Sequence, residues 1–150
     1  MGVVEAVLST LELQPGDIVC DLGSGDGRFL IAAARHEGVR ALGVEADPKL
    51  VAVTLDAAVG AGVADRVEAH CGDLLLEDFS DATVVILYLV MELHAQLVPR
   101  LQALRPGTRV VAIAFPIPGV TTASVYKVLV PEEPQPIPIY QYVVPLQPAH

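Results

Sequence analysis

The chain has 150 residues, which is the size of one domain and leaves little room for a separate substrate-binding module. Hydrophobic residues make up 53% of it, enough for a packed core, so a disordered or fibrous chain is excluded. Nine basic against eighteen acidic side chains give a formal net charge of -9, which disfavours a surface that follows the phosphates of DNA or RNA. We expect a single domain over residues 1–150 and no nucleic-acid partner.

The amino terminus predicts no export signal, because the first basic residue is Arg28 and no long apolar segment follows a basic start. The longest uncharged stretches, residues 110–126 and 134–150, are shorter than the roughly 20 residues that cross a bilayer, and prolines interrupt them. Cys20 and Cys71 lack the spacing of zinc ligands, so we expect buried, reduced thiols, no disulfide and no metal site. These features predict a cytoplasmic protein without a membrane span.

Helical and strand patterns alternate from the start of the chain. Apolar residues at helical spacing predict a helix over residues 3–13, which the turn residues 14–17 would end. A compact apolar run over 18–20 ends in Asp21 and a glycine-rich loop, and residues 29–36 are rich in alanine. This segment predicts a strand, a loop and a helix.

The same order of strand and helix then repeats. The apolar run 41–44 ends in Glu45 and predicts a second strand, and Asp47-Pro48 has the pattern of a helix N-cap followed by proline at the first helical position. Residues 66–71 predict a third strand, with Asp73 just past its end.

An unbroken apolar run over 83–89 predicts a central parallel strand covered on both faces. A helical pattern over 92–104 and a fifth strand over 110–115 follow it. The whole alternation predicts a Rossmann-like, doubly wound α/β sheet of five parallel strands joined by right-handed crossovers.

The composition changes after Phe115, because eight of the twelve prolines follow it and no helical pattern remains. Residues 125–130 and 139–144 are rich in Val, Ile and Tyr and predict two strands joined by a proline-rich loop, paired antiparallel at one edge of the sheet. Charge is sparse from Val110 onward, more so than an exposed edge should be. We therefore expect a homodimer formed through this C-terminal segment.

The loop between the first predicted strand and its helix has the pattern Asp21-x-Gly23-x-Gly25-x-Gly27. Glycines allow a sharp turn and let a ligand approach the backbone without meeting a Cβ atom. The spacing differs from the Gly-x-Gly-x-x-Gly of dinucleotide enzymes, and the carboxylates of Asp21 and Asp26 would repel a pyrophosphate. The loop favours a cationic ligand such as S-adenosylmethionine, which carries a sulfonium and an ammonium group.

Two further acids end the next two predicted strands. Glu45 is placed to accept hydrogen bonds from both ribose hydroxyls of a nucleoside, and Asp73 can accept one from an adenine amino group. The carboxyl ends of parallel strands share one edge of the sheet, where open α/β domains bind ligands. We therefore expect Asp21, Glu45 and Asp73 around one adenosyl group.

These segments resemble the class I S-adenosylmethionine-dependent methyltransferases. The run Val19-Cys20-Asp21-Leu22-Gly23-Ser24-Gly25-Asp26-Gly27 resembles motif I of that class, and Glu45 and Gly72-Asp73-Leu74 resemble its later motifs. Residues 21–34 and 104–111 look closest to small methyltransferases related to mitochondrial protein-lysine methyltransferases.

The resemblance implies the seven-stranded methyltransferase fold and methyl transfer to an acceptor, either a protein, at a lysine, or a small molecule. It implies S-adenosylmethionine as cofactor and S-adenosylhomocysteine as product. The cofactor-binding residues that it implies are Asp21, Gly23, Ser24, Gly25, Asp26, Gly27, Glu45, Asp73 and Leu74.

Tyr88 lies at the end of the fourth predicted strand and Glu92 follows it, where methyltransferases of this class present groups to the acceptor. As catalytic candidates, Tyr88 could line the methyl pocket and Glu92 could orient or deprotonate an amine, although structural roles fit both residues equally well. His70 and His94 have no second ligand or nucleophile at a useful spacing. We expect them to be ordinary polar or half-buried residues.

Other interpretations stay open on the sequence alone. Asp26 could act only as a helix N-cap, and Asp73 could be an ordinary loop acid. A non-catalytic S-adenosylmethionine-binding protein would contain the same glycine loop. A nicotinamide-dependent oxidoreductase is disfavoured by the glycine spacing and by Asp21.

Overall fold

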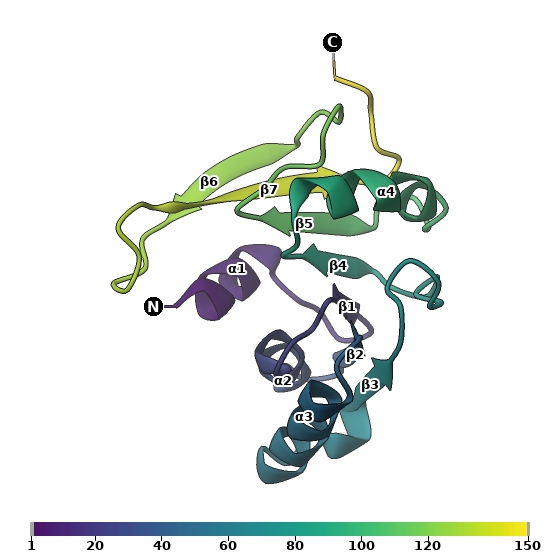
Figure 1. The fold of residues 1–150 in the computed structure, drawn as a ribbon, viewed down its shortest axis with the longest axis vertical. Coiled ribbons are helices and arrows are strands. Elements are labelled where there is room, and N and C mark those ends of the chain that lie inside the picture. Colours follow the sequence, from purple (N-terminus) through teal and green to yellow (C-terminus); the bar gives the residue numbers. More distant parts are fainter. Residues whose placement is uncertain (1, 150) are drawn as a thin grey trace.

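The computed structural model describes residues 2–149 and contains one seven-stranded sheet in the order β3-β2-β1-β4-β5-β7-β6 (Figure 1). The strands are β1 (Ile18–Leu22), β2 (Arg40–Glu45), β3 (Val67–Cys71), β4 (Val84–Leu87), β5 (Arg109–Ile113), β6 (Ser124–Val128) and β7 (Ile137–Val143). The helices are α1 (Val3–Leu11), α2 (Arg28–Ala34), α3 (Pro48–Gly60) and α4 (Met91–Gln102), with a 3-10 turn η1 (Ala64–Arg66).

The first five strands are parallel, and β7 pairs antiparallel with both β5 and β6. This is the predicted doubly wound sheet with an antiparallel pair at one edge, and the prediction is confirmed. The edge pair was predictable because its strands are rich in β-branched and aromatic residues and too close in sequence for a crossover helix.

Clusters of buried apolar side chains cover both faces of the sheet. On β4, Val84 and Ile86 pack with α1 and α2, whereas Val85 and Leu87 pack with α4. Successive side chains of a strand point to opposite faces, so all four residues of β4 are buried. Burial on both faces explains why every residue of this strand is apolar.

Most of the predicted helices and strands end one or two residues earlier than the sequence predicts, and two of these ends have a clear physical cause. β4 ends at Leu87 instead of Leu89, because the Leu89 N–H donates to the imidazole of His94 (3.1 Å) instead of to a neighbouring strand. α1 ends at Leu11 instead of Leu13, because Glu12 adopts a left-handed conformation with φ of 50°. By contrast, Asp47 caps α3 as predicted, accepting from the Lys49 N–H at 2.9 Å.

Much of the charge-poor C-terminal segment belongs to the chain's own core. Tyr142, Val144 and Leu146 are buried on the α4 face of the sheet, and the Tyr142 hydroxyl accepts from the Ile117 N–H at 2.8 Å. The larger exposed apolar side chains of the segment are Phe115, Val125, Leu129 and Val143. The C-terminal segment therefore exposes fewer apolar side chains than the sequence suggested when it predicted a homodimer.

The two thiols differ in burial. Cys20 is buried as predicted, but the prediction for Cys71 is wrong, because Cys71 ends the edge strand β3 and is exposed. Among residues 2–149, no three histidine, cysteine or acidic side chains come together in a way that could hold a metal ion. No helix in this described part is long and apolar enough to cross a membrane.

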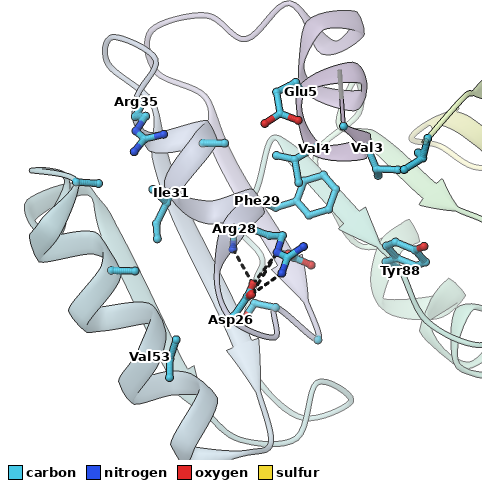
Figure 2. A pocket seen from close by; sticks show the side chains of 18 of the residues that line it. Val3, Val4, Glu5, Asp26, Arg28, Phe29, Ile31, Arg35, Val53 and Tyr88 are labelled. Atoms are coloured by element: carbon cyan, nitrogen blue, oxygen red, sulfur yellow. Dashed lines mark hydrogen bonds and ion pairs between the residues drawn. The ribbon is translucent and has the colours of Figure 1, made fainter. Parts of the chain in front are cut away.

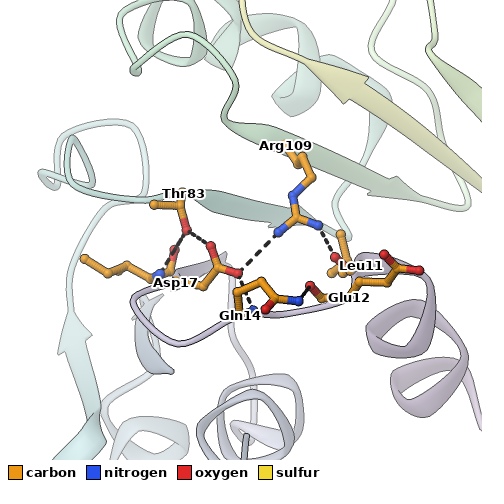
Figure 3. A network of polar contacts seen from close by, with 7 residues as sticks. Leu11, Glu12, Gln14, Asp17, Thr83 and Arg109 are labelled. Atoms are coloured by element: carbon orange, nitrogen blue, oxygen red, sulfur yellow. Dashed lines mark hydrogen bonds and ion pairs between the residues drawn. The ribbon is translucent and has the colours of Figure 1, made fainter. Parts of the chain in front are cut away.

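A polar network around Asp17 holds together the amino-terminal edge of the sheet (Figure 3). The Asp17 carboxylate accepts from the Thr83 hydroxyl (2.7 Å) and from the Gln14 N–H (2.8 Å), and one nitrogen of the Arg109 guanidinium lies 3.4 Å from it. The other Arg109 nitrogen donates to the Leu11 carbonyl. The network joins the end of α1 to the starts of β1, β4 and β5.

Candidate functional site

The glycine-rich loop, residues 23–27, folds back over the carboxyl end of the sheet between β1 and α2. The Gly23 and Ser24 N–H groups both donate to the Val44 carbonyl of β2, at 2.8 and 3.1 Å. Gly27 has φ of +85°, and a Cβ atom there would lie 2.5 Å from the Thr54 side chain of α3. A Cβ atom on Gly25 would meet nothing within 4 Å, so the top of the loop is open to a ligand.

Asp21 lies beneath this loop and is 3% exposed. Its carboxylate takes part in none of the side-chain hydrogen bonds found among residues 2–149. Burial, with a further contribution from the charge of Glu45, raises the pKa of Asp21 to about 7. The buried hydroxyl of Ser24 also lacks a partner among the described residues. Buried polar groups are normally paired, so these two point to a ligand that would pair them.

Glu45 ties the top of the loop to the connection between β2 and α3. One carboxylate oxygen accepts from the Gly25 N–H at 2.8 Å, and the other accepts from the Asp47 N–H at 3.0 Å. An ionised carboxylate has about four acceptor positions, so both oxygens can still accept from a ligand. The structure therefore joins Glu45 to the glycine loop directly, as its predicted place at a strand end suggested.

Asp73 and Leu74 follow β3 on the same side of the sheet. Asp73 is exposed, and one of its carboxylate oxygens accepts from the Leu75 N–H at 2.9 Å, which is the bond of an ordinary turn acid. The Leu74 side chain reaches the glycine loop, since it lies 4.0 Å from the Cβ position of Gly23.

Arg100 of α4 fixes this segment and was not found by sequence reasoning. Its guanidinium donates to the carbonyls of Leu74 (2.9 Å) and Glu77, and lies 4.6 Å from the centroid of the Phe79 ring. These contacts join residues more than 20 positions apart, so no local pattern signals them.

Asp26, predicted as a cofactor-binding residue, is already paired with a basic side chain. Its carboxylate accepts from the Arg28 guanidinium, with the shortest distance 2.8 Å, and this bond lowers the pKa of Asp26. The N-cap of α2 is Gly27, although Asp26 also accepts from the Arg28 N–H at 3.3 Å. Both side chains are solvent-accessible, so we expect the pair to contribute little to stability.

An open cavity of about 1210 Å³ connects the glycine loop with α1 and with the segment between β6 and β7 (Figure 2). It continues along the outer face of α2 toward Ile31 and Arg35. Of the residues predicted from sequence, those that line it are Asp21, Gly23, Ser24, Asp26 and Tyr88. Its further walls include Val3, Glu5, Phe29, Val130, Glu132, Glu133 and Ile137.

The two catalytic candidates differ in position. Tyr88, which directly follows β4, borders this cavity (Figure 2). Glu92 is exposed in the first turn of α4 and is not among the residues that line it. The geometry therefore brings Tyr88, and not Glu92, to the same space as Asp21.

His94 is fully buried and forms two hydrogen bonds, so the expectation of an ordinary polar or half-buried residue is wrong for it. Its Nε2 accepts from the Leu89 N–H, which leaves Nδ1 to donate to the Pro116 carbonyl at 3.2 Å. A usable signal was present: His94, Leu97 and Leu101 recur at helical spacing, which places the histidine on the buried face of α4. His70 is exposed, as a polar residue.

Comparison with known proteins adds independent evidence. Residues 21–124 match the family model described as the ANTKMT methyltransferase domain. A protein-lysine N-methyltransferase of Saccharolobus islandicus (strain REY15A) is 38% identical over 128 residues, which are 84% of this chain and 80% of that protein. An adenine nucleotide translocase lysine N-methyltransferase of Mus musculus is 42% identical over 77% of this chain, which spans only 50% of that longer protein.

A solved structure gives a similar result. It is described as an RNA methyltransferase from Salinibacter ruber in complex with S-adenosyl-L-homocysteine. It is 39% identical and superposes with a TM-score of 0.84, covering 95% of this chain and 90% of its own. The acceptors named for these proteins differ, whereas methyl transfer is common to all of them.

Proposed function

The chain belongs to the ANTKMT methyltransferase domain family and is an S-adenosylmethionine-dependent methyltransferase; from this premise we propose that its acceptor is a lysine amine of a protein. The family membership agrees with the predicted class and cofactor, and not with a nicotinamide-dependent oxidoreductase. The observation that carries the proposal is the cavity that extends from Asp21 and Ser24 at the glycine loop to apolar and acidic walls.

The residues around the glycine loop fit the cofactor. We propose that Glu45 accepts from the ribose hydroxyls, that Asp73 and Leu74 contact the adenine, and that Asp21 and Ser24 pair with the cationic amino-acid part. The open backbone at Gly25 leaves room for the ligand, and Gly23 and Gly27 shape the loop around it. Asp26 contributes less, because its charge is compensated by Arg28.

S-adenosylmethionine supplies, when bound, a methyl group on a positively charged sulfur, which is already strongly electrophilic. The protein must therefore mainly hold a neutral nucleophile in line and exclude water. Tyr88 lines the cavity beside the loop and is our proposed contact for the acceptor amine. A lysine amine loses its proton more easily when its ammonium form is desolvated, so burial against apolar walls favours the reactive form.

The cavity walls suit a lysine side chain. Val3, Phe29 and Ile137 offer apolar surface for its methylene groups. Glu132 and Glu133 lie on the segment between β6 and β7, and none of the ion pairs found among residues 2–149 involves them. Free carboxylates at the mouth of a cavity attract a cationic acceptor and repel the phosphates of RNA.

The proposal is tested with labelled S-adenosylmethionine and two acceptors, an unstructured lysine-rich peptide and a transfer RNA. We expect label in the peptide, with mass spectrometry placing the methyl group on a lysine. Label in the RNA alone would replace the protein acceptor by a nucleic acid and would overturn the proposal.

Glu92 keeps its predicted role only if one substitution supports it. Glu92→Gln should lower turnover without changing cofactor affinity if this carboxylate orients or deprotonates the amine. Since Glu92 does not line the cavity, unchanged turnover would leave proton removal to water. Asp65→Asn, which changes an exposed acid in η1, is the matched control.

We also propose a cytoplasmic location, a single domain and self-association through β6. Two free thiols, one of them exposed, suit a reducing compartment.

β6, the strand proposed for self-association, is an edge strand whose Val125 side chain is 52% exposed, and Leu129 beyond it is 78% exposed. Sedimentation at micromolar concentration should show a dimer, and a Val125→Lys variant should remain a monomer.

A further inference from the structure

We propose that His94 is a positioning residue for methyl transfer, which holds the segment between β4 and α4 against the glycine loop and so fixes one wall of the acceptor cavity. This inference rests on the proposed function of that cavity. His94 itself does not line the cavity, so its effect on the reaction is indirect.

The imidazole joins two chain segments that no strand ladder holds. Nε2 accepts from the Leu89 N–H at 3.1 Å, two residues after β4, and Nδ1 lies 3.2 Å from the Pro116 carbonyl beyond β5. Burial lowers the pKa of His94, which keeps the ring neutral and leaves Nε2 free to accept. A protonated ring would lose this acceptor.

The segment that His94 holds touches the proposed site at two points. The Leu89 side chain packs on the glycine loop, so closely that a Cβ atom on Gly23 would lie 2.8 Å from it. Its neighbour Tyr88 lines the cavity. A shift of this segment would therefore move both the support of the loop and the proposed contact with the acceptor.

Packing alone does not explain a histidine here. Leu97 and Leu101 lie on the same buried face of α4, where an apolar side chain would also fill the space. A buried polar ring costs free energy unless it is hydrogen-bonded, and both bonds of His94 are to the backbone of the segments it connects. The ring thus specifies the position of those segments.

Two amide variants separate the two bonds. The side-chain oxygen of Gln can take the place of Nε2 and accept from Leu89, whereas the side-chain nitrogen of Asn can take the place of Nδ1 and donate to Pro116. Turnover with the lysine-rich peptide, KM for the peptide, cofactor affinity and thermal unfolding would be measured for His94→Gln, His94→Asn and the control His36→Asn. His36 is exposed and does not line the cavity.

We expect His94→Gln to retain turnover within about threefold and His94→Asn to lose about 10- to 100-fold, the scale of a reacting group displaced by roughly 1 Å. The loss of cofactor affinity in His94→Asn should be smaller than its loss of turnover, and arises because the Leu89 side chain also supports the glycine loop. Equal turnover of the two variants, or turnover that simply follows their unfolding temperatures, would overturn the inference.

Hydrogen exchange of the unsubstituted protein gives a second test that needs neither folded variants nor an acceptor. The Leu89 amide should exchange as slowly as the amides of β4, because His94 holds it. Exchange as fast as that of exposed amides would refute the positioning role. Absence of any peptide methylation by the unsubstituted protein, together with a protected Leu89, would contradict the proposed lysine acceptor instead.

Discussion

Two aspartates at opposite ends of one strand have opposite surroundings. Asp17 precedes β1 and accepts from Thr83 and Gln14, with Arg109 beside it, whereas Asp21, within the same strand, has no partner among the described residues. The polar groups at the amino ends of the strands thus find hydrogen-bond partners within the chain. At the carboxyl ends, the buried carboxylate of Asp21 has none among the described residues. A buried acid without partners destabilises the folded chain, and this cost supports the proposal that Asp21 pairs with the cofactor.

The largest expected effect is on stability and concerns Asp17, at the amino ends of the strands. Asp17→Ala should lower the free energy of unfolding by about 3 kcal/mol, because the Thr83 hydroxyl, the Gln14 N–H and Arg109 lose their common acceptor. Denaturant unfolding measures this change, and cofactor affinity should stay within about twofold. A loss of affinity comparable to that of an Asp21 variant would show that the two edges are not independent.

At the carboxyl ends of the strands, replacing Asp21 should change cofactor binding. Asp21→Asn should weaken cofactor affinity by about 2 kcal/mol, roughly 30-fold, because a charged acceptor is replaced by a neutral amide. The variant should be at least as stable as the unsubstituted protein at pH 8. Calorimetric titration and thermal unfolding of the same sample measure both quantities, and full affinity in the variant would remove Asp21 from the site.

The raised pKa of Asp21 also predicts how pH acts on each quantity. The folded protein holds this proton more tightly than the unfolded chain, so the contribution to the free energy of unfolding is full below about pH 4 and is lost as pH rises to about 7. Cofactor affinity should change in the opposite direction, falling about tenfold from pH 8 to pH 6 as the carboxylate is protonated. Asp21→Asn should flatten both profiles, and an unchanged affinity profile would refute the link.

The smallest effect concerns the mouth of the cavity. Replacing Glu132 and Glu133 together by Gln should raise KM for the lysine-rich peptide about threefold at low salt and less at high salt, because exposed charges act at long range and are screened. Asp56→Asn with Asp65→Asn removes two exposed charges elsewhere and is the control. If both double variants raised KM equally, the effect would come from the net charge of the protein and not from the position of Glu132 and Glu133.

The predictable parts of this fold are those encoded locally. The β1 strand, its glycine loop and α2 are predicted from adjacent residues, and the end of β2 places Glu45 beside the loop without knowledge of any contact. His94 and Arg100 were missed because their partners lie on other segments: the Leu89 amide and Pro116 carbonyl for one, the Leu74 and Glu77 carbonyls for the other. Helical spacing places His94 on the buried face of α4, but neither its backbone partners nor those of Arg100 can be identified from a periodic pattern.

The bond between Glu45 and the Gly25 N–H has a consequence for how the cofactor arrives. Since this bond within the chain restrains the crest of the loop, the conformational entropy of those residues is lost during folding. Cofactor and product must exchange in every catalytic cycle, and a preformed cradle lets each exchange proceed without a slow rearrangement of the backbone. The bond from Gly25 to Glu45 therefore bears on cofactor exchange as well as on the proposed contact with the ribose.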